Sequence, residues 1–432
     1  MQNFTIDMGY RQFEQSEELK RTLAYGLVSG LVRNADEKIL IDPTLNETLT
    51  GLEILSAARE FSKTIKTLTK NPRVGIILPP AKQSFIANIA CIFAGKVPVN
   101  LNFTMGKTAA AQCLEASQID AEITTAFWSA KISAANPDFP WAKNVFDMDS
   151  LKESKPAEDF RGKTADEIAK IIGIEKFSPD KNREATLVFT SGSEGAPKAA
   201  ALTERNIIAN CLQCHLSRIF EDGDILFGNL PVFHSFGLLF EIWMAALHGV
   251  KILLYPSPID VKGNIRAIRE FKPTIMVGTP TFYRAYIRHA NKEDLASLRT
   301  VIAGAEKTPE GFQELWNSSF PNALYREGYG LTETSPVAGV NLPERDFGYF
   351  STGAREGSIG KLFPGMQAQI ISLESGEVLP FGSRGLLKMR GANVFPGYLN
   401  NPEESEKIMV RHPDGRVWIH SGDLGSMDED GF

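Results

Sequence analysis

The chain has 432 residues, of which 43% are hydrophobic and 23% are charged, and this composition is typical of soluble globular proteins. Its length predicts two or three domains, and its net charge of −6 argues against a nucleic-acid-binding surface, which needs an excess of basic side chains. The first residues, Met1 to Asp7, lack the basic and apolar regions of a signal peptide. We therefore expect a cytoplasmic protein that contacts the inner face of a membrane at most peripherally.

Strand-like and helix-like segments alternate between about residues 72 and 335. The predicted strands are Val74–Leu78, Ile123–Phe127, Thr186–Phe189, Ile225–Leu230, Lys251–Tyr255, Thr274–Val277 and Thr300–Ala303. The predicted helices include Ser84–Ala94, Asn206–Ser217, Ile265–Phe271 and Thr281–Ala290. Such alternation predicts an α/β protein with mostly parallel sheets that helices cover on both faces, and this many strands favour two doubly wound sheets packed together over one.

The most apolar long segment, Leu238 to Tyr255, contains Glu241, His248 and Lys251. Membrane-spanning helices rarely contain several such side chains, because transferring them into lipid is costly. The segment therefore predicts a buried helix that leads into a buried strand.

After about Gly357 the chain consists of short β-like segments separated by turns rich in glycine and proline. These segments are Gln367–Leu373, Gly385–Met389 and Arg416–Ile419. The pattern predicts a small antiparallel β-barrel. We expect three subdomains: residues 1–205, with an N-terminal segment packed on the second subdomain, then residues 206–345 and the barrel of residues 346–432.

Four cysteines are too few for a disulfide scaffold and indicate a reducing compartment. Cys211 and Cys214 have a spacing seen in metal and redox sites, but no second cysteine pair exists to complete a tetrahedral zinc site. We expect instead two small buried residues one helical turn apart.

The most informative segment runs from Thr190 to Lys198, with the sequence Thr-Ser-Gly-Ser-Glu-Gly-Ala-Pro-Lys. It follows a predicted strand and precedes a predicted helix that starts near Thr203. Glycines let several backbone N–H groups point at one anion, the hydroxyls add donors, and the lysine adds a positive charge. The segment therefore predicts a phosphate-binding loop between a strand and a helix; the alternative is a surface loop with an exposed lysine.

Two later motifs suggest the rest of a nucleotide site. In Glu327–Thr334, Tyr329 stands between Gly328 and Gly330 and can stack on a flat base, while Glu333 offers an oxygen ligand suited to Mg²⁺. In Trp418–Asp423, the final aspartate can accept hydrogen bonds from both hydroxyls of a ribose. Each motif alone also fits an ordinary turn.

Ligands of doubly wound sheets bind at the carboxyl ends of the strands. The phosphate loop follows a predicted strand, and so do the segments Val277–Pro280, Ala303–Glu306 and Gly328–Glu333. We expect all four to line one crevice.

The order of the three motifs resembles the adenylate-forming (acyl-CoA synthetase) superfamily, from about residue 50 to the last residue. Blocks that agree with it are Pro231–Gly237, Gly360–Gly365 and Gly391–Tyr398. Within the superfamily, the chain is most similar to the synthetase part of the 2-acylglycerophosphoethanolamine acyltransferase/acyl-acyl-carrier-protein synthetase branch. The segments that carry this likeness are Thr190–Gly195, Leu230–Leu238, Leu254–Pro258, Val301–Lys307 and Gly95–Pro98.

The resemblance implies roles for the matched positions. The β- and γ-phosphates of ATP would contact Thr190, Ser191, Gly192, Ser193, Gly195 and Lys198. The adenine would lie against Gly304, Ala305, Glu306, Tyr329 and Gly330. The α-phosphate would contact Thr332, and the ribose would contact Asp423. Glu333 would bind Mg²⁺. His234 would border the acyl carboxylate and the path of the thiol, with Phe236, Gly278 and Thr279 lining the acyl pocket. The expected catalytic residues are thus His234, Thr332, Glu333 and Lys198.

Two positions depart from the superfamily pattern. Ala199 replaces the usual glycine after Pro-Lys, and Glu194 stands where threonine is more common. A carboxylate near triphosphate is electrostatically unfavourable unless it points away or meets Mg²⁺.

The resemblance implies ATP- and Mg²⁺-dependent conversion of a fatty acid to acyl-AMP, and transfer of the acyl group to a phosphopantetheine thiol on coenzyme A or on acyl-carrier protein. The sequence ends at Phe432, before the mobile C-terminal domain of roughly one hundred residues that supplies a catalytic lysine in the superfamily, so we expect weak adenylation by this chain alone. The alternatives are a module that only binds ATP or acyl-AMP, a ligase for an aryl or amino acid, and an interaction protein without a ligand.

Overall fold

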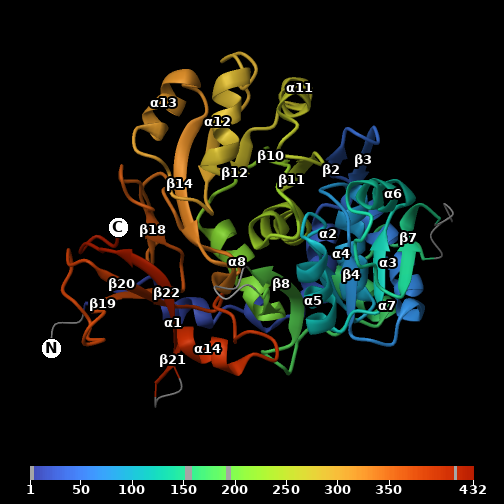
Figure 1. The fold of residues 1–432 in the computed structure, drawn as a ribbon, viewed down its shortest axis with the longest axis horizontal. Coiled ribbons are helices and arrows are strands. Elements are labelled where there is room, and N and C mark those ends of the chain that lie inside the picture. Colours follow the sequence, from blue (N-terminus) through green and yellow to red (C-terminus); the bar gives the residue numbers. More distant parts are fainter. Residues whose placement is uncertain (1–3, 151–157, 191–195, 413–415) are drawn as a thin grey trace.

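The computed structural model describes residues 4–150, 158–190, 196–412 and 416–432. Its largest element is a nine-stranded sheet that runs through the centre of the molecule (Figure 1). Every neighbouring pair from β14 to β2 is parallel, and antiparallel strands flank this part at both edges. The strand order is β18 (Lys361–Leu362), β15 (Val337–Val340), β14 (Leu324–Gly330), β13 (Thr300–Ala303), β12 (Ile275–Gly278), β10 (Ile225–Gly228), β11 (Lys251–Leu254), β2 (Lys38–Asp42) and β3 (Glu47–Thr50).

Helices cover both faces of this sheet because successive strand residues point to opposite sides. In β10, for example, Leu226 belongs to the main core and Phe227 to a second core on the other face. The second core includes Tyr283 and Trp316 and lies under α11 (Val261–Phe271), α12 (Pro280–His289) and α13 (Phe312–Ser319), at the top of Figure 1. The main core includes side chains from α2 (Leu23–Arg33) and α8 (Glu204–Leu216).

A second, four-stranded sheet is entirely parallel. Its order is β5 (Val97–Asn100), β4 (Arg73–Ile76), β6 (Ala121–Thr124) and β7 (Asn144–Asp147). The helices of this part are α3 (Gly51–Leu68), α4 (Lys82–Phe93), α5 (Lys107–Ser117), α6 (Ala126–Ala135) and α7 (Ala165–Ile172). The prediction of two mostly parallel sheets is confirmed.

The apolar segment from residue 238 to 255 is buried, as predicted. It comprises α9 (Ser235–Leu238), the π-helical segment η3 (Leu239–Met244), α10 (Ala245–His248) and then β11. Among the described residues, no helix combines the length and the apolarity needed to cross a bilayer.

The C-terminal part forms a five-stranded antiparallel sheet, which confirms the antiparallel pairing predicted there. Its described strands form an open sheet with β1 and β21 at the edges, in place of the predicted closed barrel. Its order is β1 (Ile6–Asp7), β19 (Gln367–Ile371), β20 (Gly385–Arg390), β22 (Val417–Gly425) and β21 (Met409–Arg411). Helix α14 (Pro402–Ile408) lies beside it (Figure 1). The N-terminal strand β1 joins this sheet, while β2 and β3 join the nine-stranded one; the division at residues 205 and 345 stays a prediction.

The helix predicted near Thr203 is present, but a strand that was not predicted lies between it and the phosphate loop. The loop connects β8 (Glu184–Thr190) to β9 (Lys198–Thr203), and these strands pair antiparallel as a separate two-stranded sheet. Helix α8 begins only after β9, where the Thr203 side chain accepts a hydrogen bond from the Asn206 N–H. The alanines that follow Lys198 have no bulk or charge to oppose pairing, and two of the three are buried.

All four cysteines are buried. Cys211 and Cys214 lie on α8, as predicted, and burial raises the pKa of both thiols. No cluster of three or more metal-binding side chains occurs in the described part of the chain.

Glu122 on β6 makes the stability of the protein depend on pH. Its side chain is 0% exposed, accepts one hydrogen bond from the Ala142 N–H at 2.9 Å, and leaves Oε1 without a described partner. Burial raises the pKa of this carboxyl from 4.5 to about 7, because the ionised form is poorly solvated there. The folded protein therefore holds this proton at pH values where the unfolded chain has released it.

The stabilisation that comes from this raised pKa is complete below pH 4.5 and is lost as the pH rises to about 7. We expect the free energy of unfolding of the parent to fall by about 3 kcal/mol more than that of Glu122→Gln between pH 4.5 and 8. Urea denaturation across this range measures the difference. Glu115→Gln, at an exposed position on α5, is the control; identical pH profiles for the parent and Glu122→Gln would contradict the role of Glu122.

Candidate active site

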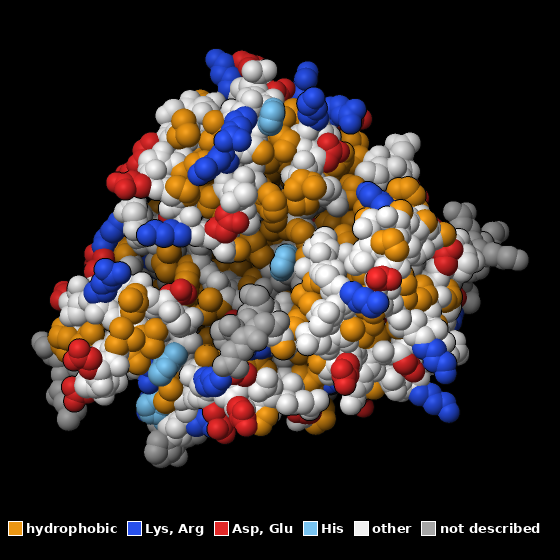
Figure 2. All heavy atoms as spheres, viewed as in Figure 1, with side chains coloured by type: hydrophobic (Ala, Val, Ile, Leu, Met, Phe, Trp, Pro, Cys, Tyr) orange, Lys and Arg blue, Asp and Glu red, His pale blue; other side chains and the backbone are white. Residues whose placement is uncertain are grey.

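The candidate site lies where several parallel strands of the large sheet end. β12 ends at Gly278, β13 at Ala303 and β14 at Gly330, and the loop after β10 leads to His234. Figure 2 shows this face hollowed at its centre, with hydrophobic side chains gathered between the part that carries α12 and β14 and the part that carries α5 and α6. A hollow is therefore present on this face, while the expectation that all four segments line it stays a prediction, since residues 191–195 lie outside the described residues.

Lys198 is the first residue of β9 and pairs with Thr190 at the end of β8. Its ammonium group forms an ion pair with Glu404 of α14, and both side chains are largely buried, at 20% and 15% exposed. The pair lowers the pKa of the Glu404 carboxyl. The ammonium group also lies 5.6 Å from the centre of the Tyr398 ring. Lys198 is thus held in place by an anion supplied by the same chain.

Glu333 reaches the same place from another element. It lies in the short helix η4 (Thr332–Thr334), and its carboxylate accepts a hydrogen bond of 2.5 Å from the Tyr398 hydroxyl. Its backbone oxygen accepts a second bond from the Phe395 N–H at 2.9 Å. Tyr398 therefore brings together Lys198 and Glu333, which are more than a hundred residues apart in the sequence.

Tyr329 and Asp423 form a second contact between separate sheets. Tyr329 lies on β14, and its hydroxyl donates a hydrogen bond of 2.6 Å to the Asp423 carboxylate on β22. Burial, and then this carboxylate, raise the pKa of the Tyr329 hydroxyl. The backbone N–H of Asp423 donates to the Ser421 hydroxyl at 3.0 Å, which fixes the turn. The Asp423 carboxylate thus already accepts a hydrogen bond from one hydroxyl group.

The segment that contains His234 faces η4. Ser235 Oγ lies 3.3 Å from Thr332 Oγ1. Desolvation by the surrounding protein lowers the pKa of the His234 imidazole, so the ring is neutral at pH 7. The ring of Phe233 lies edge-on to the His234 ring, with centroids 4.8 Å apart.

Phe236 approaches the ends of β12 and β13. A Cβ placed on Gly304 would lie 3.5 Å from the Phe236 ring, so the two residues are in contact range. The Gly304 N–H donates to the Gly278 oxygen at 3.0 Å. Thr279 caps α12 by accepting the Phe282 N–H. The residues predicted to line an acyl pocket are therefore neighbours.

The segment after Gly304 turns sharply. Ala305 has a φ of 65°, a left-handed conformation that non-glycine residues adopt infrequently. The Glu306 carboxylate accepts a hydrogen bond of 2.6 Å from the Thr281 hydroxyl. Glu306 is therefore bound to the start of α12.

Part of the predicted phosphate loop lies outside the described residues. These positions are Ser191, Gly192, Ser193, Glu194 and Gly195. Among the predicted ligands of the β- and γ-phosphates, the structure places only Thr190 and Lys198, at the two ends of the hairpin loop.

Sequence reasoning assigned no role to Tyr398, Glu404 or Ser235. Tyr398 and Ser235 stand in the conspicuous segments Gly391–Tyr398 and Pro231–Gly237, which could have drawn attention to them. Glu404 follows an asparagine-proline helix start and has no local signal, because its importance comes from the distant Lys198.

The chain is similar to known proteins in sequence and in fold. A family model described as AMP-binding enzyme matches residues 31–399. A long-chain-fatty-acid–CoA ligase of Bacillus subtilis is 29% identical over 415 residues, which span 89% of this chain and 71% of that protein. The Acyl-CoA ligase SID4 of Ajellomyces capsulatus is 34% identical over 249 residues, or 57% of this chain and 41% of that protein.

Solved structures show the same fold at lower identity. The long-chain-fatty-acid-CoA ligase FadD1 of Archaeoglobus fulgidus matches with a TM-score of 0.77 and 20% identity, over 96% of this chain and 83% of that one. The anthranilate CoA ligase AuaEII, in complex with anthranoyl-AMP, also has a TM-score of 0.77 at 20% identity, over 96% of this chain and 76% of that one.

The chain has the α/β fold of the adenylate-forming enzymes, and its family match and relatives support ATP use and acyl- or aryl-CoA ligase activity. The family model matches most of the sequence, so the chain belongs to the AMP-binding enzyme family.

Proposed function

We propose that this chain binds ATP and a fatty acid and joins them as acyl-AMP with release of pyrophosphate. A carboxylate oxygen of the fatty acid attacks the α-phosphorus, and the bond from that phosphorus to the bridging oxygen of pyrophosphate breaks. One observation carries the proposal, which is that side chains from four separate elements meet in two contacts. Lys198 and Glu333 both lie against Tyr398, and Tyr329 donates a hydrogen bond to Asp423.

The charged groups in the crevice suit a nucleoside triphosphate. Lys198 already holds the Glu404 carboxylate, so it can hold a phosphate oxygen in the same way. Asp423 accepts a hydroxyl hydrogen bond from Tyr329, and a ribose hydroxyl is a donor of the same kind. Thr190 and Thr332 would add hydroxyl donors, and the loop of residues 191–195 would add N–H donors to the β- and γ-phosphates.

The residues also fit Mg²⁺. Glu333 is a carboxylate with one described side-chain partner, the Tyr398 hydroxyl, and carboxylates are ligands that Mg²⁺ prefers alongside phosphate oxygens. Mg²⁺ bound there would neutralise phosphate charge. Lys198 would share that task, while Thr332 would orient the α-phosphate. Neutral His234 would border the carboxylate without adding charge.

An acyl chain suits the apolar part of the crevice better than an amino acid does. Phe236 contacts Gly304, and its ring lies 5.5 Å from that of Phe240. The nearby buried carboxyl, Glu241, accepts the Leu230 N–H, and burial raises its pKa. Burial thus disfavours the charged form of Glu241, so this carboxyl is poorly suited to pair with the ammonium group of an amino acid.

The acceptor that we propose is a phosphopantetheine thiol. Its sulfur attacks the acyl carbonyl carbon, and AMP leaves with the electrons of the acyl–phosphate bond. Coenzyme A is the acceptor in the names of the relatives, and acyl-carrier protein is the alternative that the similarity of the segments Thr190–Gly195 and Leu230–Leu238 suggests.

A hydroxamate assay tests the proposal directly. Hydroxylamine traps acyl-AMP, so the chain is incubated with ATP, Mg²⁺, hydroxylamine and one acid at a time: octanoate, palmitate, benzoate or 4-coumarate. We expect hydroxamate from a fatty acid at least about tenfold above that from the aryl acids, because an apolar pocket gains free energy with each buried methylene. Omission of ATP is the control.

Other results would select the alternatives. Hydroxamate from aryl acids alone would make the chain an aryl ligase. ATP binding without any hydroxamate would favour a binding module that needs a further catalytic group. Absence of both would overturn the proposed nucleotide site.

A further inference from the structure

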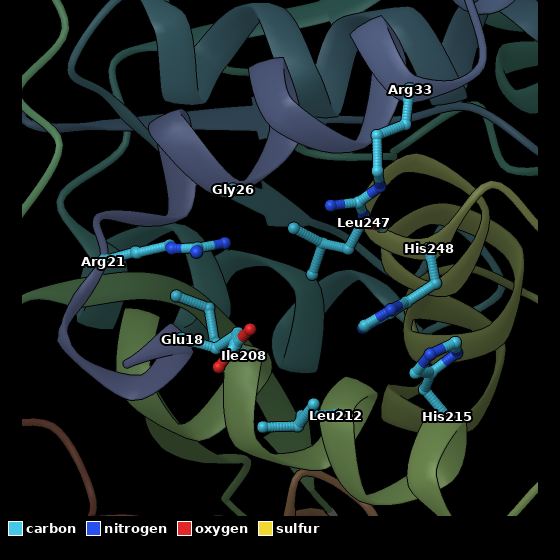
Figure 3. A pocket seen from close by; sticks show the side chains of 9 residues that line it. All are labelled: Glu18, Arg21, Gly26, Arg33, Ile208, Leu212, His215, Leu247 and His248. Carbon is cyan, nitrogen blue, oxygen red and sulfur yellow. Dashed lines mark hydrogen bonds between the residues drawn. The ribbon is translucent and has the colours of Figure 1, made fainter. Parts of the chain in front are cut away.

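A surface pocket with a volume of about 200 Å³ lies between η1 (Glu18–Lys20), α2, α8 and α10 (Figure 3). None of its lining residues belongs to the candidate active site. Its polar lining consists of Glu18, Arg21, Arg33, His215 and His248, and the aliphatic side chains of α8 and α10 form the rest.

Two guanidinium groups point into this space from the two ends of α2 (Figure 3). Arg21 Nε is buried and has no hydrogen-bond partner among the described residues. Arg33 donates through Nη2 to the Leu247 oxygen at 2.7 Å, while Nη1 has only a long contact of 3.4 Å to the Ser29 hydroxyl. Donor capacity on both arginines is therefore not used within the described protein. Arg33 is exposed, whereas Arg21 Nε is buried, and a buried donor without a partner is costly unless a ligand completes it.

Two histidines form another wall of the pocket. The rings of His215 and His248 are stacked, with centroids 4.5 Å apart and an angle of 16° between their planes. In the described part of the chain, no hydrogen bond to either ring is formed. Nearly parallel rings direct their nitrogens alongside each other, so they do not converge on one metal ion, and two guanidinium groups would repel a cation.

The charge balance of the pocket favours an anion. Among the described residues, Glu18 is the one acidic group that lines it, and its carboxylate accepts a hydrogen bond of 2.6 Å from the Ser16 hydroxyl. Two permanent positive charges therefore face one negative charge, before any protonation of His215 or His248.

We infer that this pocket binds a small tetrahedral oxyanion: inorganic phosphate or one phosphate group of pyrophosphate. A guanidinium group can donate two parallel hydrogen bonds to two oxygens of one phosphate, and the neutral imidazoles can add N–H donors. The volume is below that of pockets that enclose drug-sized ligands, which argues against a nucleotide. The inference does not depend on the proposed function.

Titration calorimetry of the whole chain with inorganic phosphate and, separately, with pyrophosphate tests the inference. We use His215→Glu because His215 is exposed, so the folded structure tolerates the change while a negative charge enters the pocket. We expect it to weaken binding of the anion at least about tenfold, since the reversed charge opposes the ligand. Arg21→Gln should weaken the same binding, which provides a second variant.

Two controls separate this pocket from the rest of the molecule. Lys143→Glu makes a similar charge change at an exposed position outside the pocket, and Lys198→Met removes the cation of the candidate active site. Both should keep the anion site. Because the candidate active site can itself take pyrophosphate, the two pocket variants are titrated in the Lys198→Met background. Binding in that background that survives both His215→Glu and Arg21→Gln, or no binding of either anion there, would overturn the inference. The anion with the lower Kd, phosphate or pyrophosphate, is the one that the pocket prefers.

Discussion

Replacing Lys198 with methionine is expected to lower the rate of adenylate formation by about 100- to 1,000-fold, the usual cost of removing one charged group that stabilises a transition state. Lys198 is largely buried beside Glu404 and the Tyr398 ring, and methionine keeps its length while removing the charge. Pyrophosphate release with ATP and a fatty acid measures the rate. Lys170→Met, at an exposed position on α7, is the matched control.

Glu404→Gln distinguishes the charge of Lys198 from its packing. This variant removes the anion that Lys198 holds, so the ammonium group becomes available to phosphate while it still lies beside the Tyr398 ring. We expect ATP to bind a few-fold more tightly, in contrast to the loss in Lys198→Met. Equal rates in Lys198→Met and the parent would remove this residue from the mechanism, and weaker ATP binding in Glu404→Gln would show that the ion pair positions the lysine.

The second large effect is expected at Asp423. Asp423→Asn should weaken ATP binding by about 10- to 100-fold, because a hydrogen bond to a charged group contributes about 1.5–3 kcal/mol. The substitution retains the size of the side chain and one oxygen acceptor, so the turn at Ser421 should persist. Binding of ATP, measured by calorimetry with thermal melting as a check on folding, reports the loss.

Tyr329→Phe is the informative companion variant. It removes the hydroxyl that donates to Asp423 but keeps the aromatic face for the base. If Asp423 binds the ribose, Tyr329→Phe should change affinity much less than Asp423→Asn does. Unchanged affinity in Asp423→Asn, or an equal loss in both variants, would contradict the proposed ribose contact.

Much of the fold could be predicted because its signals are local. The strand predicted at Thr300–Ala303 coincides with β13, and the helix predicted at Asn206–Ser217 lies within two residues of α8 at its start. Side-chain periodicity and capping residues act over a few positions, so they can be read directly from the chain. The predicted and observed ends of an element differ where a capping residue sets the end. Helix α12, for example, begins at Pro280 because Thr279 caps it.

The hairpin at the phosphate loop could not be predicted in the same way. Lys198-Ala-Ala-Ala-Leu-Thr carries no clear strand signal, and alanine itself favours helix. Pairing with β8 decides its conformation, which illustrates how tertiary context overrides weak local propensity.

The sequence by itself determined the alternation of strands and helices, the buried segment from residue 238 to 255 and the loops that carry the candidate ligands, because hydrophobic period and turn chemistry are short-range properties. Only the tertiary structure decided that Glu404 meets Lys198 and that Tyr329 meets Asp423, 94 residues away. Such contacts depend on how whole sheets pack. Many residues throughout the core contribute to the free energy of that packing, so no single segment of the sequence predicts it.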